Sequence, residues 1–185
     1  MAITEVNEAM TALVGRIQRS TVQIQSPRGG GAGVVWSRDG IIVTNAHVVA
    51  AGRAEVEAEG RVYRATIIGA DRQRDLAALQ IPATNLTPLP LAPRDSLRPG
   101  SLVIAVGHPL GASGAVSAGI LHAADAHWVR ADIRLLPGNS GGPLTDVQGR
   151  LIGINAMVAG GLGLAIPLDA VEAFLRQWEP QTEVA

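Results

Sequence analysis

The chain has 185 residues and a formal net charge of −1; all 15 basic residues are Arg, and they form no basic run. Strong binding of nucleic acid through phosphate contacts is therefore not expected. The chain has no Cys, which excludes disulfides, thiolate nucleophiles and Cys-based zinc sites.

The first half of the chain predicts one helix followed by short strands. Apolar residues recur at helical spacing over residues 3–20. Short apolar or alternating runs then follow one another, separated by turn signals, which is typical of a sandwich or a barrel. The expected turns are Pro27 with Gly29–Gly31, Asp39–Gly40, Gly52, Gly60 and Gly69.

Residues 82–99 contain five prolines and predict a linker between two lobes, because Pro is unsuited to a central strand. A second set of strands follows, with a hairpin turn at Asp146–Gly149. Residues 168–178 predict a closing helix with one apolar face. We expect a single domain over residues 1–185, with one lobe over about 1–90 and a second over about 91–170.

The segment LLPGNSGGPL, Leu135–Leu144, places Ser140 among glycines. Glycine is costly unless a special backbone shape or a close approach requires it. A serine nucleophile needs a base to take its proton and an acid to orient that base. His47 follows an expected apolar strand, and Asp75 precedes another. Asp71 is the competing acid.

The segments TNAHVV, DLAAL and PGNSGGPL occur in the order His, Asp, Ser. Together they resemble the HtrA (Do-like, Deg) family of trypsin-like serine proteases. The segments GAGVVWSRDGIIVTNAHVV and VIAVGHPLGASGAVSAGIL are also similar to that family. The resemblance spans roughly residues 30–170. It implies an all-β fold of two six-stranded antiparallel barrels of the chymotrypsin type, with a helix at each end.

The resemblance also implies a role for each residue. Ser140 would be the nucleophile, His47 the general base, and Asp75 the acid that orients the imidazole. Backbone amides of Gly138 and Ser140, with Asn139, would form the oxyanion hole. The implied activity is a serine endopeptidase for unfolded or exposed polypeptides, acting through an acyl-enzyme in protein quality control, with neither metal nor organic cofactor.

The same resemblance implies a substrate pocket formed by Leu135 and the stretches 154–157 and 161–164, with Ile154, Asn155, Ala156 and Leu162 as the site residues. Leu135 and Leu162 would suit an aliphatic substrate side chain. Arg134 departs from the small residue of the family; pointing into the pocket, it would favour acidic side chains or block entry, whereas pointing to solvent it would have little effect. The loop at 156–161 is short, and such loops gate activity in the family.

Other interpretations have less support. Gly29–Val35 is glycine-rich but lacks the Gly-Lys-Ser/Thr ending of a phosphate loop. His108 and His122, with Asp125 nearby, do not have the spacing of a metal site. Arg134 and the short loop leave open a trypsin-like fold that binds peptides or acts as a chaperone, with an inactive or gated oxyanion loop.

Assembly and location are expectations only. The family has a C-terminal PDZ domain, and this sequence has no segment that resembles one. The helix at 3–20 would serve in a homotrimer or pack on the barrels. Neither a signal peptide nor an integral membrane segment is expected. The protein would be cytoplasmic or begin after a removed leader; the family is often periplasmic or extracytoplasmic.

Overall fold

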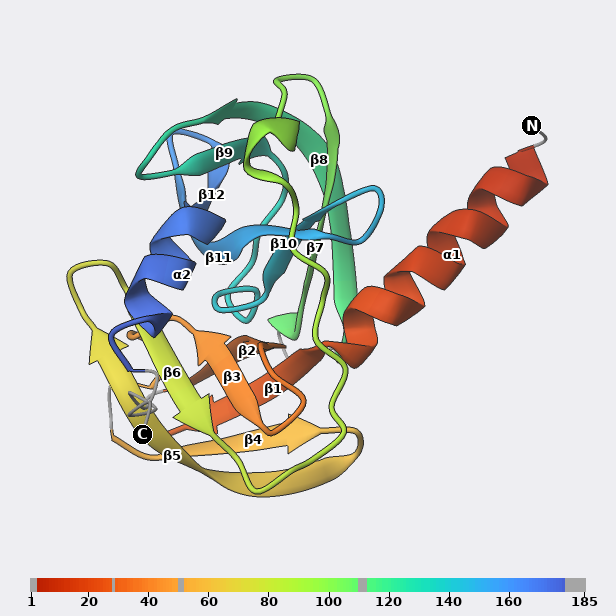
Figure 1. Cartoon of the computed structure of the whole chain (residues 1–185). Helices are drawn as coiled ribbons and strands as arrows, with labels where there is room; N and C mark the ends of the chain where they lie inside the picture. Colours follow the sequence, from red (N-terminus) through yellow and green to blue (C-terminus); the bar gives the residue numbers. More distant parts are fainter. Residues whose placement is uncertain (1–2, 28, 50–51, 110–112, 179–185) are drawn as a thin grey trace, which may run out of the picture.

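The computed structural model describes residues 3–27, 29–49, 52–109 and 113–178. Within them, the strands form two closed antiparallel barrels, as predicted (Figure 1). The first barrel has the spatial order β1-β2-β3-β6-β5-β4. Its strands are β1 (Thr21–Ser26), β2 (Gly29–Val35), β3 (Ile41–Thr44), β4 (Ala54–Ala58), β5 (Arg61–Asp71) and β6 (Leu76–Gln80).

The second barrel has the spatial order β10-β11-β12-β9-β8-β7. Its strands are β7 (Leu102–Gly107), β8 (Ala115–Ala124), β9 (Val129–Asp132), β10 (Pro143–Asp146), β11 (Leu151–Ala159) and β12 (Leu162–Pro167). The predicted hairpin turn joins β10 to β11, where the Gly149 amide donates to the Asp146 carbonyl at 3.0 Å.

Two helices flank the barrels. The outer part of α1 (Ile3–Arg19) projects away from them, whereas α2 (Leu168–Leu175) packs against the barrels (Figure 1). The connection at 82–99 is not a strand, and its 3₁₀ helix η1 spans Arg94–Ser96. Several of its apolar side chains are nevertheless buried, so this linker packs on the barrels. In the described part of the chain, no helix is both long and apolar enough to span a membrane.

One apolar cluster joins both barrels and both helices. Ile17 of α1, Val43 of β3, Ile154 of β11 and Phe174 of α2 all belong to it and are fully buried. Burying apolar side chains is the main favourable contribution to folding, and this cluster also fixes one barrel against the other. The alignment of side chains from the two barrels therefore depends on it.

We expect Phe174→Ala to lower the free energy of unfolding by about 3–5 kcal/mol, because it leaves a cavity at the centre of this cluster. Phe174 has no exposed surface, whereas Val62 on β5 is 65% exposed. Denaturant unfolding followed by circular dichroism measures the change. Val62→Ala is the matched control, expected to change stability by less than about 1 kcal/mol. Equal effects of the two substitutions would contradict this packing.

Three sequence predictions were wrong in detail. Residues 29–31 and Gly69 lie within strands β2 and β5 rather than in turns. A Cβ added at Gly31 would lie 2.7 Å from the Ser140 carbonyl oxygen, and one at Gly69 would overlap the Trp178 ring. These glycines therefore permit close packing. Residues 156–159 belong to β11, which a turn at Gly160 and Gly161 with positive φ joins to β12.

Candidate active site

The pairing of β3 with β6 brings His47 next to Asp75. His47 follows β3, Asp75 precedes β6, and Thr44 pairs with Ala77 in this ladder. Asp75 Oδ2 lies 2.7 Å from His47 Nδ1, and Asp75 Oδ1 accepts the His47 amide at 3.0 Å. The Asn45 side chain donates to the Asp75 carbonyl at 3.0 Å and supports the left-handed backbone of Asp75, whose φ is 55°.

The competing acid, Asp71, has a different role. Its Oδ1 accepts the backbone amides of Gln73 and Arg74, both at 2.9 Å. It therefore stabilises the turn between β5 and β6. Of the two acids that the sequence offered, the structure brings Asp75 into contact with His47.

The contact with Asp75 determines which nitrogen of a neutral His47 ring is left to accept a proton. A neutral imidazole that donates from Nδ1 to the carboxylate leaves Nε2 free to accept a proton. The hydrogen bond and charge of Asp75 raise the pKa of His47, and partial burial acts against them. The ring is half exposed, so it is open to a substrate.

Ser140 lies in the connection from β9 to β10 and contacts the first barrel through its backbone. Its carbonyl accepts the Ala32 amide of β2 at 2.8 Å. A Cβ added at Gly141 would overlap the Ala32 carbonyl oxygen and the Thr44 hydroxyl, so the turn passes very close to β2 and β3. This close approach explains a glycine directly after the serine.

The Ser140 hydroxyl donates to the Ala156 carbonyl on β11 at 3.0 Å. Within the described residues it makes no hydrogen bond to His47. Contacts between a nucleophile and its base are often loose before substrate binds, so this geometry is compatible with catalysis.

The turn before Ser140 leaves two backbone amides available. Gly138 has φ of 105°, the Asn139 amide donates to the Leu136 carbonyl at 2.9 Å, and the Gly138 carbonyl accepts the His108 amide at 3.0 Å. The amides of Gly138 and Ser140 have no acceptor in the part of the chain that the structure describes. Asn139, by contrast, cannot offer its amide while it closes this turn, which corrects its inclusion among the expected donors.

A pocket of about 410 Å³ lies beside Ser140, between the 135–140 segment and β11. Leu135, Asn155 and Ala156 line it, and their role in binding substrate stays a prediction. Met157, at the end of the stretch expected there, also lines it, and so does Val158, which the sequence prediction did not include. The lining is mainly apolar, so the pocket suits an aliphatic side chain.

Two residues predicted for the pocket do not line it, and Arg134 takes the second of the two orientations that the sequence left open, toward solvent. Ile154 is fully buried in the core that joins the barrels. Leu162 pairs with Ala159 at the tip of the β11–β12 hairpin and does not line the pocket. Arg134 is exposed and is also absent from the lining, so the pocket has no cationic wall from this residue.

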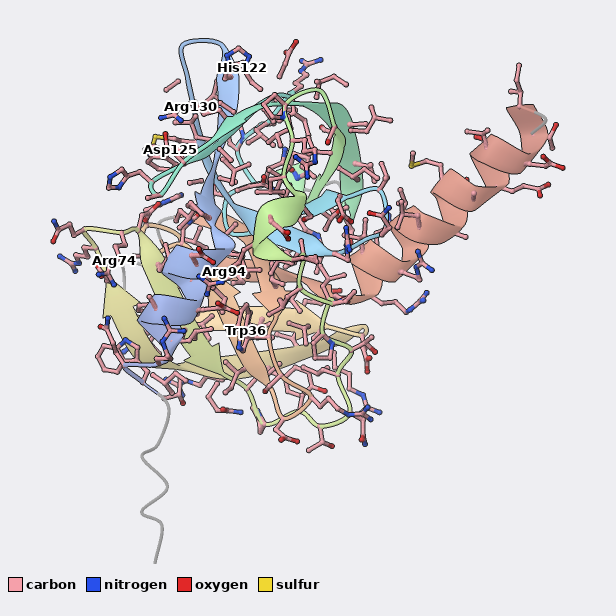
Figure 2. The ribbon with its side chains drawn as sticks, turned by 45° about the horizontal axis from the view of Figure 1, so that its top comes forward. Trp36, Arg74, Arg94, His122, Asp125 and Arg130 are labelled. Atoms are coloured by element: carbon pink, nitrogen blue, oxygen red, sulfur yellow. The ribbon has the colours of Figure 1, made fainter. Side chains whose placement is uncertain are left out.

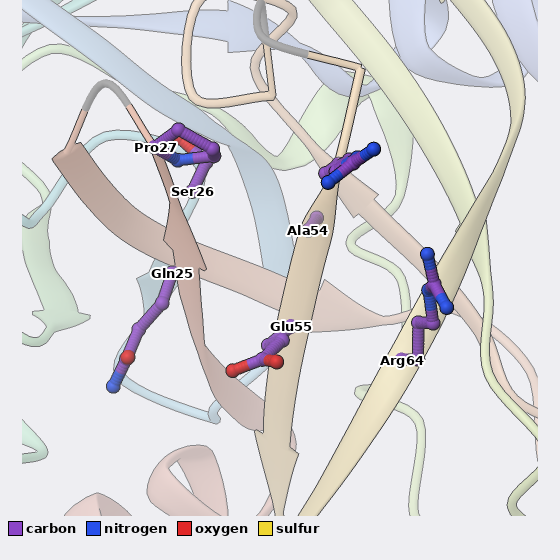
Figure 3. A pocket seen from close by; sticks show the side chains of 7 residues that line it. Gln25, Ser26, Pro27, Ala54, Glu55 and Arg64 are labelled. Atoms are coloured by element: carbon purple, nitrogen blue, oxygen red, sulfur yellow. The ribbon is translucent and has the colours of Figure 1, made fainter.

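A second cleft, of about 650 Å³, is lined in part by His47. It runs from Gly138 along the β1–β2 hairpin, and His108 is part of its wall. A shallower pocket of about 420 Å³ continues from it and shares Gln25 and Ser26 with it. Figure 3 shows this shallower pocket, with Glu55 and Arg64 on strands β4 and β5.

The structure gives no support to the alternative ligand sites. Within the described residues, no cluster of His, Asp and Glu side chains is arranged to hold a metal ion. Asp125 forms an ion pair with Arg130, which lowers the pKa of its carboxyl together with the amides of His127 and Trp128 (Figure 2). The glycine-rich segment at 29–35 is strand β2, without the helix that a phosphate loop requires.

The comparisons with known proteins find a trypsin-like peptidase domain and serine proteases. Residues 31–154 match the model of a trypsin-like peptidase domain. Serine protease HTRA2, mitochondrial, of Drosophila grimshawi is 38% identical over 164 residues, which cover 80% of this chain and 38% of that protein. Serine protease HTRA1 of Xenopus tropicalis is 38% identical over 167 residues, covering 82% of this chain and 36% of that protein. This chain thus spans well under half the length of these relatives.

A solved structure agrees with these sequence matches. The crystal structure of the serine endoprotease from Yersinia pestis superposes with a TM-score of 0.84 at 31% identity. The match covers 91% of this chain and 65% of that one.

Proposed function

This chain belongs to the trypsin-like peptidase family, with the HtrA serine proteases among its relatives, and from that premise we propose that it is a serine endopeptidase. The observation that carries the proposal is the contact of Asp75 with His47, next to an oxyanion turn with two amides available. Both barrels form one catalytic unit in this proposal, because His47 and Asp75 come from the first and Ser140 from the second.

In the proposed mechanism, His47 Nε2 takes the proton from the Ser140 hydroxyl as Oγ attacks the scissile carbonyl carbon. The carbonyl π electrons move to its oxygen, and the amides of Gly138 and Ser140 stabilise that oxyanion. The imidazolium, stabilised by Asp75, then gives its proton to the leaving amine as the C–N bond breaks. Water, activated by His47, hydrolyses the resulting ester by the reverse sequence of proton transfers.

We further propose that the substrates are unfolded or exposed polypeptides, cleaved after aliphatic residues. An extended segment can place its side chain in the apolar pocket formed by Leu135, Ala156 and Met157. The test is digestion of reduced, denatured casein, with the cleavage sites read by mass spectrometry. Cuts after Val, Ile, Leu or Ala support the proposal; a wild-type protein that leaves denatured casein intact favours the alternative of a binding module.

The activity is expected to rise with pH in the mildly acidic range. His47 must be neutral to accept the serine proton, and Asp75 raises its pKa above the ordinary value of 6.5. The catalytically competent fraction therefore grows as pH increases through this raised pKa. A profile of kcat/KM from pH 5 to 9 tests this, with a midpoint expected above 6.5. A midpoint well below 6.5 would contradict the effect assigned to Asp75.

For assembly, we propose that copies of the chain associate through α1. Ile3 and Val6 are 89% and 44% exposed on the part of the helix that projects from the barrels. Exposed apolar side chains on one helix favour contact with another protein surface. Sedimentation equilibrium of the wild type beside Ile3→Glu/Val6→Glu is the measurement; a homotrimer that the substitutions dissociate is the expected result.

A further inference from the structure

The segment Gly107–Pro109 interlocks with the oxyanion turn. A Cβ added at Gly107 would lie 2.5 Å from Asn139 Oδ1, and one at Gly138 would lie 2.5 Å from the His108 carbonyl oxygen. The His108 amide also donates to the Gly138 carbonyl at 3.0 Å. The direction in which the Gly138 carbonyl points, and hence the exposure of nearby amides, depends on where residue 108 lies.

The His108 ring is fixed by an unusual hydrogen bond. His108 is only 9% exposed, and its Nδ1 accepts the Gly114 amide at 3.3 Å. A ring nitrogen that accepts carries no proton, so the neutral ring has its hydrogen on Nε2. Nε2 is buried and has no hydrogen-bond partner in the described part of the chain.

The other side of Gly114 is bound by the N-terminal helix. Gln18 on α1 donates from Nε2 to the Gly114 carbonyl at 2.7 Å. Gly114 thus joins two hydrogen bonds, its amide to His108 and its carbonyl to α1. A continuous series of contacts connects Gln18, Gly114, His108 and Gly138.

We propose that His108 is a positioning residue for the proposed acyl transfer: its neutral ring, fixed by Gly114 and α1, holds the oxyanion turn with the Gly138 and Ser140 amides available. This inference rests on the proposed peptidase function. It assigns to α1 a second effect besides packing, because displacing Gln18 loosens the same series of contacts.

Protonation of His108 provides a readout that a purely structural residue lacks. Burial lowers the pKa of His108, and the negative charge of Glu57 on β4 acts against it. The other charged or titratable side chains around the two pockets that His108 lines are Arg19, Glu59 and His47. In the imidazolium both ring nitrogens donate, so Nδ1 can no longer accept the Gly114 amide. This hydrogen bond is lost only below pH 6.5, because the pKa of His108 is lowered from that value.

The first test measures the rate at which a fluorophosphonate labels Ser140. His108→Leu removes the acceptor and is expected to slow labelling about tenfold to a hundredfold, approaching the loss of one oxyanion donor. His108→Asn, which can still accept the Gly114 amide, restores most of the rate. Gln18→Ala gives a smaller decrease, of about two- to fivefold. The matched control is His122→Asn on the exposed face of β8, expected to label like the wild type.

The pH dependence of labelling separates the roles further. Below the pKa of His47, the logarithm of the labelling rate falls by one unit for each pH unit. In the wild type the slope of this plot becomes steeper, toward two, as His108 is protonated. In His108→Asn it stays at one. Equal rates in wild type and His108→Leu, or identical slopes in wild type and His108→Asn, overturn the inference.

A second measurement does not depend on activity. In a His47→Ala background, the amide resonances of Gly114 and Ser140 should titrate with the same midpoint as the His108 ring. In His47→Ala/His108→Asn, the shift at that midpoint should disappear. If the resonances of these two amides do not shift at the midpoint of the His108 titration, the inference is contradicted even when the enzyme is active. A wild type that does not label contradicts the proposed function, and these titrations still decide the role of His108.

Discussion

Ser140→Ala is expected to lower kcat for peptide hydrolysis on the order of a millionfold, because it removes the Oγ that attacks the carbonyl in the proposed mechanism. The fold should be unchanged, since among the described residues the hydroxyl makes a single hydrogen bond, to the Ala156 carbonyl. Hydrolysis of a fluorogenic peptide with an aliphatic residue before the scissile bond measures the loss. Ser101→Ala, at an exposed serine, is the matched control and should retain full activity.

The result also distinguishes two classes of function. If the protein is a binding module, Ser140→Ala and wild type bind a denatured polypeptide equally and neither cleaves it. If it is a peptidase, Ser140→Ala still binds but turns over no substrate. Activity in Ser140→Ala comparable to that of wild type, from a preparation free of contaminating protease, would place the chemistry elsewhere.

Asp75→Asn is expected to lower kcat about 10⁴-fold, because an amide no longer holds the imidazole in the tautomer that accepts at Nε2. Asn tolerates the left-handed backbone of position 75, where φ is 55°, so folding should survive. The midpoint on the acid side of the pH profile should also move to a lower pH, because the carboxylate that raises the His47 pKa is gone.

Asp71→Asn is the control for this second prediction. Asp71 stabilises the β5–β6 turn through two amides, which an Asn oxygen can still accept, and it has no hydrogen bond to His47, so turnover should stay close to that of the wild type. Thermal unfolding and kcat are measured on both variants. A larger fall in kcat for Asp71→Asn than for Asp75→Asn would reverse the assignment of the two acids.

The candidate catalytic groups were predicted from distinctive local settings together with the resemblance of the segments TNAHVV, DLAAL and PGNSGGPL to the HtrA family. His47 and Asp75 border apolar strands, and glycines surround Ser140. The pairing of β3 with β6, which joins the first two, follows from a barrel in which both strands are buried. Both helices and the succession of short strands were recognisable from hydrophobic patterns and turn signals, whereas the two barrels were implied by the family resemblance.

Tertiary contacts decided the rest. Gly31 and Gly69 accommodate Ser140 and Trp178, which lie far away in the sequence, so local patterns interpreted these glycines as turns. The register of β11 shifts between Asn155 and Met157. Because a register shift changes which face of the strand a side chain occupies, the resemblance alone did not separate the buried Ile154 from the pocket-lining Met157 within the predicted stretch.

The resting position of the Ser140 hydroxyl was equally hidden from the sequence. Its partner, the Ala156 carbonyl, is a backbone atom on another strand, and no residue type indicates it. The Asn139 amide is a similar case, since turn closure onto Leu136 removes it from the expected donors. Side-chain identity specifies which groups are present, whereas packing decides which atoms they meet.

The most direct test of the central claim is to treat the protein with a fluorophosphonate and locate the adduct by intact mass and peptide mapping. The account predicts one adduct per chain on Ser140, lost in His47→Ala and formed more slowly in Asp75→Asn. A folded protein that gains no adduct between pH 6 and 9, or gains it equally well without His47, would contradict an assembled Ser140–His47–Asp75 site.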